Sequence, residues 1–210
     1  MASRIMHLAV AYVLAENCET GSRERFLAGA VIPDALPKKQ GHFWKFFDED
    51  RYKTYDLAGF RQRYSDRLGD GLYIGYYMHL VMDLVFRDHL YHGIGYVPTD
   101  EKTAQLHKDY SIINGYICLK FGISKLPELP DSLDTEPIIA GHGDAVRAFF
   151  ADMRRDLTER PLFRSPVYYT EKIADEYINR AVGVCKREVA ALCGKGKHID
   201  ELSFSWLRHK

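Results

Sequence analysis

Residues 72–90 read LYIGYYMHLVMDLVFRDHL, an almost unbroken apolar run with a few polar side chains inside it. The run is longer than a typical strand and has the length of a buried helix. His79 and Asp83 lie one helical turn apart, so both project from one face, about 40° apart around the helix axis. A buried carboxylate is costly unless it is paired or bound to a metal. The two residues therefore indicate either a hydrogen-bonded core pair or part of a metal site.

Helical spacing of apolar residues continues on both sides of this run. We expect further helices over 4–16, 23–30, 56–68, 99–120, 145–159 and 170–193, separated by Gly and Pro residues. In the last of these, Glu188 is the one position of the apolar series that should not face the core. Residues 33–55 are predicted to form an irregular aromatic loop and 122–137 a long loop. We find no internal repeat and no strand pattern of useful length, so the sequence predicts an all-α bundle, a single domain over residues 1–210.

Composition excludes several classes of function. The chain has 210 residues, 46% of them hydrophobic, and its 29 basic side chains are balanced by 29 acidic ones. This balance argues against a basic nucleic-acid-binding surface and against an acidic tail. No apolar run reaches the length of a transmembrane helix. Residues 1–16 lack a signal-peptide pattern and the four scattered cysteines form no CxxC pair, so we expect a cytoplasmic protein with reduced thiols.

More side chains that could bind a metal lie in the first half of the chain. An all-helical protein has to build a site from inward side chains of several helices, and His with Asp is a ligand set for zinc or iron. A cluster of such residues therefore favours a metal site over an isolated core pair. Besides His79 and Asp83, the candidates are His7, Asp34, His42, His89 and His107.

The order of these residues resembles the zinc-dependent phospholipase C family, which includes the S1/P1-type nucleases and the N-terminal domain of glycosylphosphatidylinositol phospholipase D. The resemblance covers about residues 1–115, and residues 116–210 are expected to add further helices. The segments that carry it are His7, FLAGAVIPDA at 26–35, GHFW at 41–44 and GYYMHLVMDLVFRDHL at 75–90.

The resemblance implies an all-helical protein with one to three zinc ions, for which iron, nickel or manganese are alternatives. One ion would be held by His42, His79 and Asp83. A second would be held by His7 with Asp83 as a bridging ligand, where the family also uses its free N-terminus. Asp34 would be the carboxylate near the metals, acting as a ligand or as the catalytic base that orients the attacking water.

A third ion would be held by His89 and His107. The family places a carboxylate one turn after its second histidine, whereas this sequence has Ser111 there. Asp109 and Asn114 are the possible substitutes, and a cluster of fewer than three ions is the alternative.

The implied activity is hydrolysis of a phosphate ester, in particular a phosphodiester, in a small molecule or a lipid. This reaction needs a nucleophile at neutral pH and neutralisation of the phosphoryl charge, and a bound divalent ion supplies both by lowering the pKa of water from ~15.7 toward ~7. A non-catalytic helical protein with a remnant metal site, acting in binding or assembly, is the alternative. The helical HD-type phosphohydrolases are disfavoured because the sequence has no adjacent His-Asp dipeptide.

Residues around these candidates have two interpretations each. Tyr76, Tyr77 and Tyr110 could orient the imidazole rings. The aromatic residues of 43–55 form either an apolar wall beside the metals or a separately packed cluster. Basic residues in the same part of the chain either meet a phosphate or are solvated; they are Lys38, Lys39, Lys45 and Arg51.

Overall fold

The computed structural model describes residues 2–49, 52–158, 165–204 and 207–208. These residues are mainly helical, which confirms the predicted all-α class. The α-helices are α1 (Arg4–Asn17), α2 (Arg23–Gly29), α3 (Lys38–Gly41), α4 (Leu57–Arg63), α5 (Gly71–Asp88), α6 (Asp100–Lys120), α7 (Gly143–Thr158) and α8 (Glu171–Leu192). Short turns of 3-10 helix cover Ile32–Ala35, Ser65–Arg67, Leu133–Thr135 and Glu201–Ser203, and a π-helical turn, His89–Gly93, extends α5.

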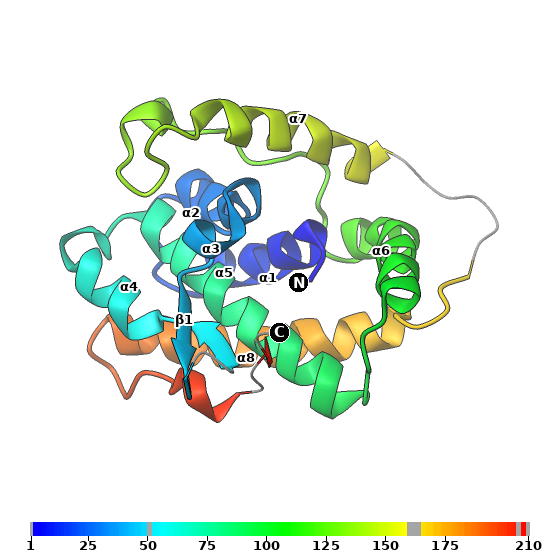
Figure 1. Ribbon diagram of the computed structural model, residues 1–210. Helices are drawn as coiled ribbons and strands as arrows, with labels where there is room; N and C mark the ends of the chain where they lie inside the picture. Colours follow the sequence, from blue (N-terminus) through cyan, green and yellow to red (C-terminus); the bar gives the residue numbers. More distant parts are fainter. Residues whose placement is uncertain (1, 50–51, 159–164, 205–206, 209–210) are drawn as a thin grey trace.

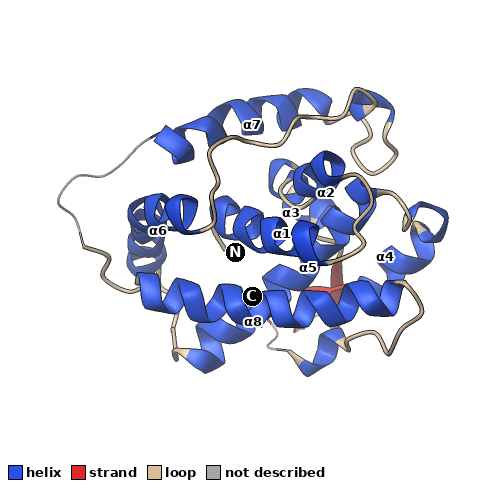
Figure 2. Cartoon of the chain, turned by 180° about the vertical axis from the view of Figure 1, so that it is seen from behind, coloured by secondary structure: helices blue, strands red, loops and turns tan. Residues whose placement is uncertain are grey.

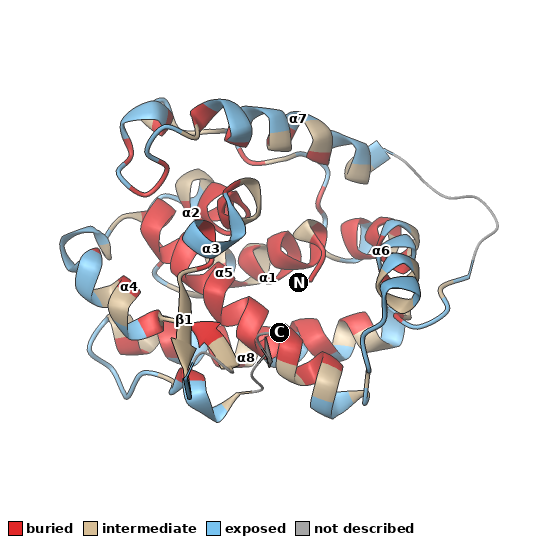
Figure 3. Ribbon diagram, viewed as in Figure 1, coloured by how far each residue is buried: buried red, intermediate tan, exposed pale blue. Residues whose placement is uncertain are grey.

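Helix α5 is the centre of the fold. Residues 71–87 are all buried, and α5 packs most extensively against α2 and α8. Figure 1 shows α5 running through the middle of the molecule, with α8 crossing below it and α7 across the top, and Figure 2 shows the same arrangement from behind. In Figure 3 the buried residues are concentrated on α5 and its neighbours, while the outer face of α7 is exposed. The quoted apolar run is thus the core helix around which the others pack.

Two glycines bring α2 and α5 into backbone contact. A Cβ on Gly29 would lie 2.2 Å from the carbonyl oxygen of Leu72, and one on Gly75 would lie 2.1 Å from the carbonyl oxygen of Phe26. No real side chain tolerates such distances, so only glycine permits this approach. The contact places the end of α2 beside the face of α5 that carries His79.

Residues 33–55 are more regular than the sequence predicts. After α3, strands β1 (Trp44–Phe47) and β2 (Tyr52–Tyr55) pair antiparallel, with Trp44 opposite Tyr55, and the short β3 (Leu207–Arg208) pairs with the other edge of β2. The strands are four residues long, and all of β1 is half-buried on both faces. An alternating pattern is therefore absent, which is why the expectation of an irregular loop was wrong.

The start of α1 is held by polar contacts to α6 and α7. Ser3 caps the helix, because its Oγ accepts the Met6 N–H at 3.1 Å, and its hydroxyl donates to Oδ1 of Asn114 at 3.0 Å. Arg4 forms ion pairs with Asp152 and Asp156 of α7. These contacts place the first turns of α1, including His7, against the rest of the core.

Glu188 is buried, contrary to the prediction that it does not face the core. Its carboxylate accepts hydrogen bonds from the Tyr77 hydroxyl at 2.7 Å and from the Ile199 N–H at 2.8 Å, and it lies 2.6 Å from Nδ1 of His198. A buried carboxylate with this many partners is stable in a core.

Among the described residues, no helix combines the length and the apolar character required to cross a bilayer.

Candidate metal centre

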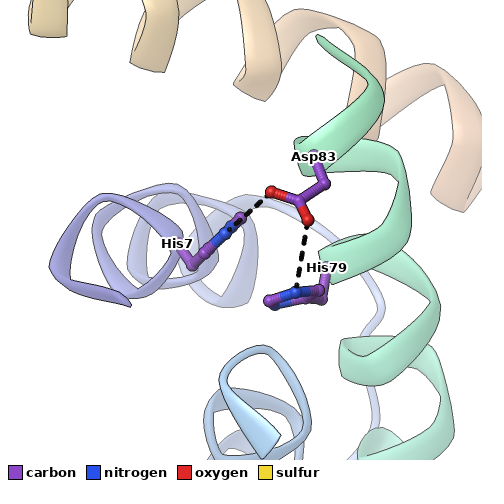
Figure 4. Close-up of side chains that lie close together, drawn as sticks. All are labelled: His7, His79 and Asp83. Carbon is purple, nitrogen blue, oxygen red and sulfur yellow. Dashed lines mark ion pairs between the residues drawn. The ribbon is translucent and has the colours of Figure 1, made fainter. Parts of the chain in front are cut away.

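Side chains from distant parts of the sequence converge beside α5. His79 and Asp83 come from α5 and His7 from α1, and Figure 4 shows these three pointing toward one another. Asp34 comes from the 3-10 turn Ile32–Ala35, and His42 directly follows α3. All but Asp34 are essentially inaccessible, and the Asp34 side chain is 9% exposed.

Two overlapping groups in this cluster lie close enough together that each could hold a metal ion. One consists of His7, His79 and Asp83, and the other of Asp34, His42 and His79, with the ligand atoms of each within 4.8 Å of one another. The Nε2 atoms of His42 and His79 are 3.4 Å apart. His42 Nε2 also lies 3.4 Å from Oδ1 of Asp34. The expectation that His42 and His79 meet is therefore confirmed.

Asp83 connects the two groups through its two oxygens. Its Oδ1 lies 3.3 Å from Nε2 of His7, whereas its Oδ2 lies 3.6 Å from Nε2 of His42 and 3.8 Å from Nε2 of His79. The hydroxyl of Tyr55 donates to Oδ2 at 3.1 Å. This geometry is that of a carboxylate able to bridge two ligand sets.

A hydrogen bond on the side of the ring away from the cluster orients His79. Its Nδ1–H donates to the carbonyl oxygen of Ala30 at 2.9 Å, a contact made possible by the close packing of α2 on α5. This bond directs Nε2 into the cluster and leaves His79 a single nitrogen for a ligand. His79 can therefore serve one ion and not two.

Several buried polar atoms of the cluster have no hydrogen-bond partner within the described part of the chain. They are both ring nitrogens of His7, Nδ1 of His42 and one oxygen each of Asp34 and Asp83. Native proteins pair nearly all buried polar groups, because each unpaired one costs about 1–3 kcal/mol. A cation would satisfy the atoms that face the cluster, and imidazole with carboxylate is a donor set that suits zinc. The residues present thus fit a divalent metal ion.

Burial and mutual charge hold His79 and the two carboxyl groups in the protonation states that bind metal. Burial and the neighbouring His7 lower the pKa of His79 to about 4. Burial raises the pKa of both carboxyl groups, but the surrounding histidines outweigh it, so the pKa of Asp83 lies well below its usual value and that of Asp34 below it. Neutral His79 and ionised carboxylates are the forms that bind metal.

Asp34 is where the cluster meets open space. It lines a cavity of about 460 Å³ between the start of α1, α6 and α7, and no other member of the cluster lines this cavity in the described structure. The remaining lining residues are Ala2, Ser3, Arg4, His107, Tyr110, Ser111, Asn114, Phe149 and Asp156. A small molecule in this cavity could reach the cluster past Asp34. The free N-terminus, which the family resemblance implies as a further ligand of the second ion, belongs to Met1, and Met1 lies outside the described residues.

His89 and His107 belong to neither metal-binding group among the described residues. His89 follows α5 into the π-helical turn, where its ring faces Tyr177 of α8 at 6.2 Å between centroids. His107 is exposed and its ring faces Tyr110 at 5.9 Å, beside the 460 Å³ cavity. The two histidines thus have different surroundings, and the structure does not place them as the expected third pair.

The substitutes for the third-site carboxylate have structural roles. Asp109 accepts backbone N–H groups from Val167, Tyr168 and Tyr169, which anchors the segment that leads into α8. Asn114 accepts the Ser3 hydroxyl. Neither residue is part of a metal-binding group in the described structure.

Sequence reasoning missed the two groups that orient the ligands. Tyr55 lies in the segment for which the sequence predicts an irregular loop. The aromatic runs on either side of the polar residues 48–51 are nevertheless typical of a β-hairpin. The Ala30 carbonyl carries no sequence signal. Of the predicted orienting residues, Tyr76 donates to the carbonyl oxygen of Gly41 at 2.7 Å, next to His42, whereas Tyr77 donates to Glu188 instead.

No protein-family model, curated protein or solved structure matches this chain. The fold and the site therefore define its class: a mainly helical protein with a buried His/Asp cluster that could hold a metal ion.

Proposed function

We propose that this protein is a metal-dependent hydrolase of phosphate esters, with phosphodiesters as the principal substrate class. The observation that carries the proposal is the convergence of three imidazoles and two carboxylates beside a cavity that Asp34 lines. The resemblance of residues 1–115 to zinc-dependent phospholipases C supports the same proposed activity. Zinc is the proposed metal, and iron, nickel or manganese are alternatives.

Two ion positions account for the geometry. His42, His79 and Asp83 Oδ2 would hold one ion, and His7 with Asp83 Oδ1 would hold a second. A bound divalent ion would lower the pKa of water and neutralise charge on the phosphoryl oxygens. Because His89 and His107 lie outside the cluster, we propose one or two ions rather than three.

Asp34 is the proposed catalytic residue. Its carboxylate is ionised at neutral pH, lies 3.4 Å from Nε2 of His42 and reaches the cavity. It can accept a proton from a water molecule in the cavity and orient that water toward the phosphorus atom. The buried partners His7 and Asp83 have no such access and would serve as ligands.

The first test is metal content. Protein purified without a histidine tag should contain at least about one equivalent of a transition metal per chain, because the ligands are prearranged and both carboxylates are ionised. Less than about half an equivalent, after growth with zinc, iron, nickel and manganese present, would contradict the proposal.

The second test separates catalysis from binding. Asp83→Asn should lose the metal and lower hydrolysis of bis-p-nitrophenyl phosphate by at least about 100-fold, because both ligand sets share this carboxylate. Glu136→Gln is the matched control, since Glu136 is buried but bonds to Arg25 and Tyr73 away from the cluster. Metal-dependent stability of the wild-type protein without turnover would instead support the non-catalytic binding or assembly protein.

A further inference from the structure

Arg87 is a buried cation close to the candidate metal centre. It lies one helical turn after Asp83 on α5 and is 5% exposed. Its Nη1–H donates to the main-chain oxygen of Lys53 at 3.3 Å, and its guanidinium carbon lies 4.5 Å from the centre of the Tyr55 ring. The guanidinium group is thus held in place by β2.

The other edge of this guanidinium is unpaired. Neither Nε nor Nη2 of Arg87 has a hydrogen-bond partner within the described residues, and both atoms are buried. Their N–H bonds point in parallel, and this edge of arginine matches two oxygens of a carboxylate or a phosphate. A buried charge without such a partner is strongly unfavourable, so this edge indicates an anionic ligand.

Tyr55 connects Arg87 to the metal centre, and a second basic side chain, Lys53, lies near the guanidinium. The guanidinium of Arg87 stacks on the ring of Tyr55, and the Tyr55 hydroxyl donates a hydrogen bond to Asp83. A single side chain therefore separates Arg87 from the cluster. Partial burial and the positive charges of Arg87 and Lys38 lower the pKa of Lys53. Several cations near one another favour a multiply charged anion over a carboxylate.

We propose that the Nε–H and Nη2–H edge of Arg87 binds a phosphoryl oxyanion beside the candidate metal centre. The identity of the ligand as the phosphoryl group of a substrate rests on the proposed function. Binding of the anion itself requires no metal and no turnover. If the proposed function holds, Arg87 is a substrate-binding residue that the metal-ligand pattern does not include.

The test uses inorganic phosphate and metal-stripped protein. Arginine Nε–H resonances in ¹H–¹⁵N spectra should include one that shifts saturably with phosphate and that is missing in Arg87→Met. Phosphate affinity should fall by at least about tenfold in Arg87→Met, because a charge-assisted bidentate contact is lost. Arg180→Met is the matched control: it removes the same charge from α8, where Arg180 forms an ion pair with Asp88 of α5, and it should leave phosphate binding unchanged.

Two outcomes would overturn the proposal. One is an Arg87 resonance that phosphate does not shift in the wild-type protein, a measurement that does not depend on any variant folding. The other is an equal response to acetate, which would assign a carboxylate ligand. Asp83→Asn distinguishes this proposal from the proposed function, because it should lose metal and turnover yet still bind phosphate at Arg87.

Discussion

His79 is the residue in which burial and function are most closely linked. It is fully inaccessible, its Nδ1–H donates to the carbonyl oxygen of Ala30, and its Nε2 faces His42 and Asp83. Burial and His7 lower its pKa from 6.5 to about 4. The folded protein therefore keeps this imidazole neutral at a pH where the unfolded chain would protonate it.

The pH dependence of stability follows from this difference. Between pH 6.5 and about 4 the unfolded state binds a proton at His79 that the native state does not, so metal-free protein should lose stability as the pH falls through this range. The full contribution is present above pH 6.5, and the loss should approach about 3 kcal/mol near pH 4. Urea unfolding of the stripped protein across this range measures it.

His79→Gln provides the comparison, because glutamine can keep the bond to Ala30 and does not titrate. The variant should show a flatter dependence between pH 6.5 and 4. The pKa values of Asp34 and Asp83 are lowered, so their stabilisation is lost progressively as the pH falls below about 5, and the interval from pH 6.5 to about 5 is where the two proteins differ through His79 alone. An equal slope in both proteins would refute the assigned pKa of His79.

Among the elements, the contact of α2 with α5 has the greatest effect on the site. It depends on Gly75, because any Cβ there would lie 2.1 Å from the carbonyl oxygen of Phe26. Gly75→Ala should force the helices apart and destabilise the fold by about 1–3 kcal/mol, the range measured for overpacked cores. It should also weaken metal binding, since His79 loses its contact with Ala30. Urea unfolding and metal titration test both effects.

Gly183 offers a matched control on α8. A Cβ there meets nothing within 4 Å, so Gly183→Ala should stabilise the protein by up to about 1 kcal/mol through helix propensity alone. If Gly→Ala destabilises the protein at position 75 and stabilises it at position 183, the close packing of α2 on α5 is the cause of the destabilisation. If Gly75→Ala were as stable as the wild type, the contact would not be essential.

At the scale of the whole molecule, α7 forms one wall of the cavity beside the cluster. It contributes Phe149 and Asp156 to the lining, and Arg4 at the start of α1 connects to it through Asp152 and Asp156. The Arg4 guanidinium carbon also lies 5.2 Å from the centre of the Phe149 ring. One arginine thus holds the outer helix over the route to Asp34.

Arg4→Met should loosen this attachment. Hydrogen exchange in residues 143–158 should accelerate several-fold while α5 stays protected, because local openings depend on local contacts. Lys172→Met is the control, since Lys172 is exposed and its ion pair with Glu176 lies within α8. Unchanged exchange in α7 would show that its apolar face alone holds it in place.

The sequence by itself determined most of the helices and the residue types of the candidate site. Apolar periodicity is a local property, so the long helices were predicted to within two residues at each end, whereas the helix expected over 56–68 ends at Arg63 and α3 was not predicted. His79 and Asp83 were identified from one-turn spacing, and His7, Asp34 and His42 from residue type and order. The resemblance to a known family supplied their pairing.

Only the tertiary structure decided which side chains meet. It placed Tyr55 on Asp83, buried Glu188 among partners from distant segments and left His89 and His107 in separate surroundings. It also brought Arg87 against β2 with one edge unpaired among the described residues. The physical reason is that periodicity records the environment of a helix face, whereas a contact between distant segments depends on how closely the backbones pack, which here depends on two glycines.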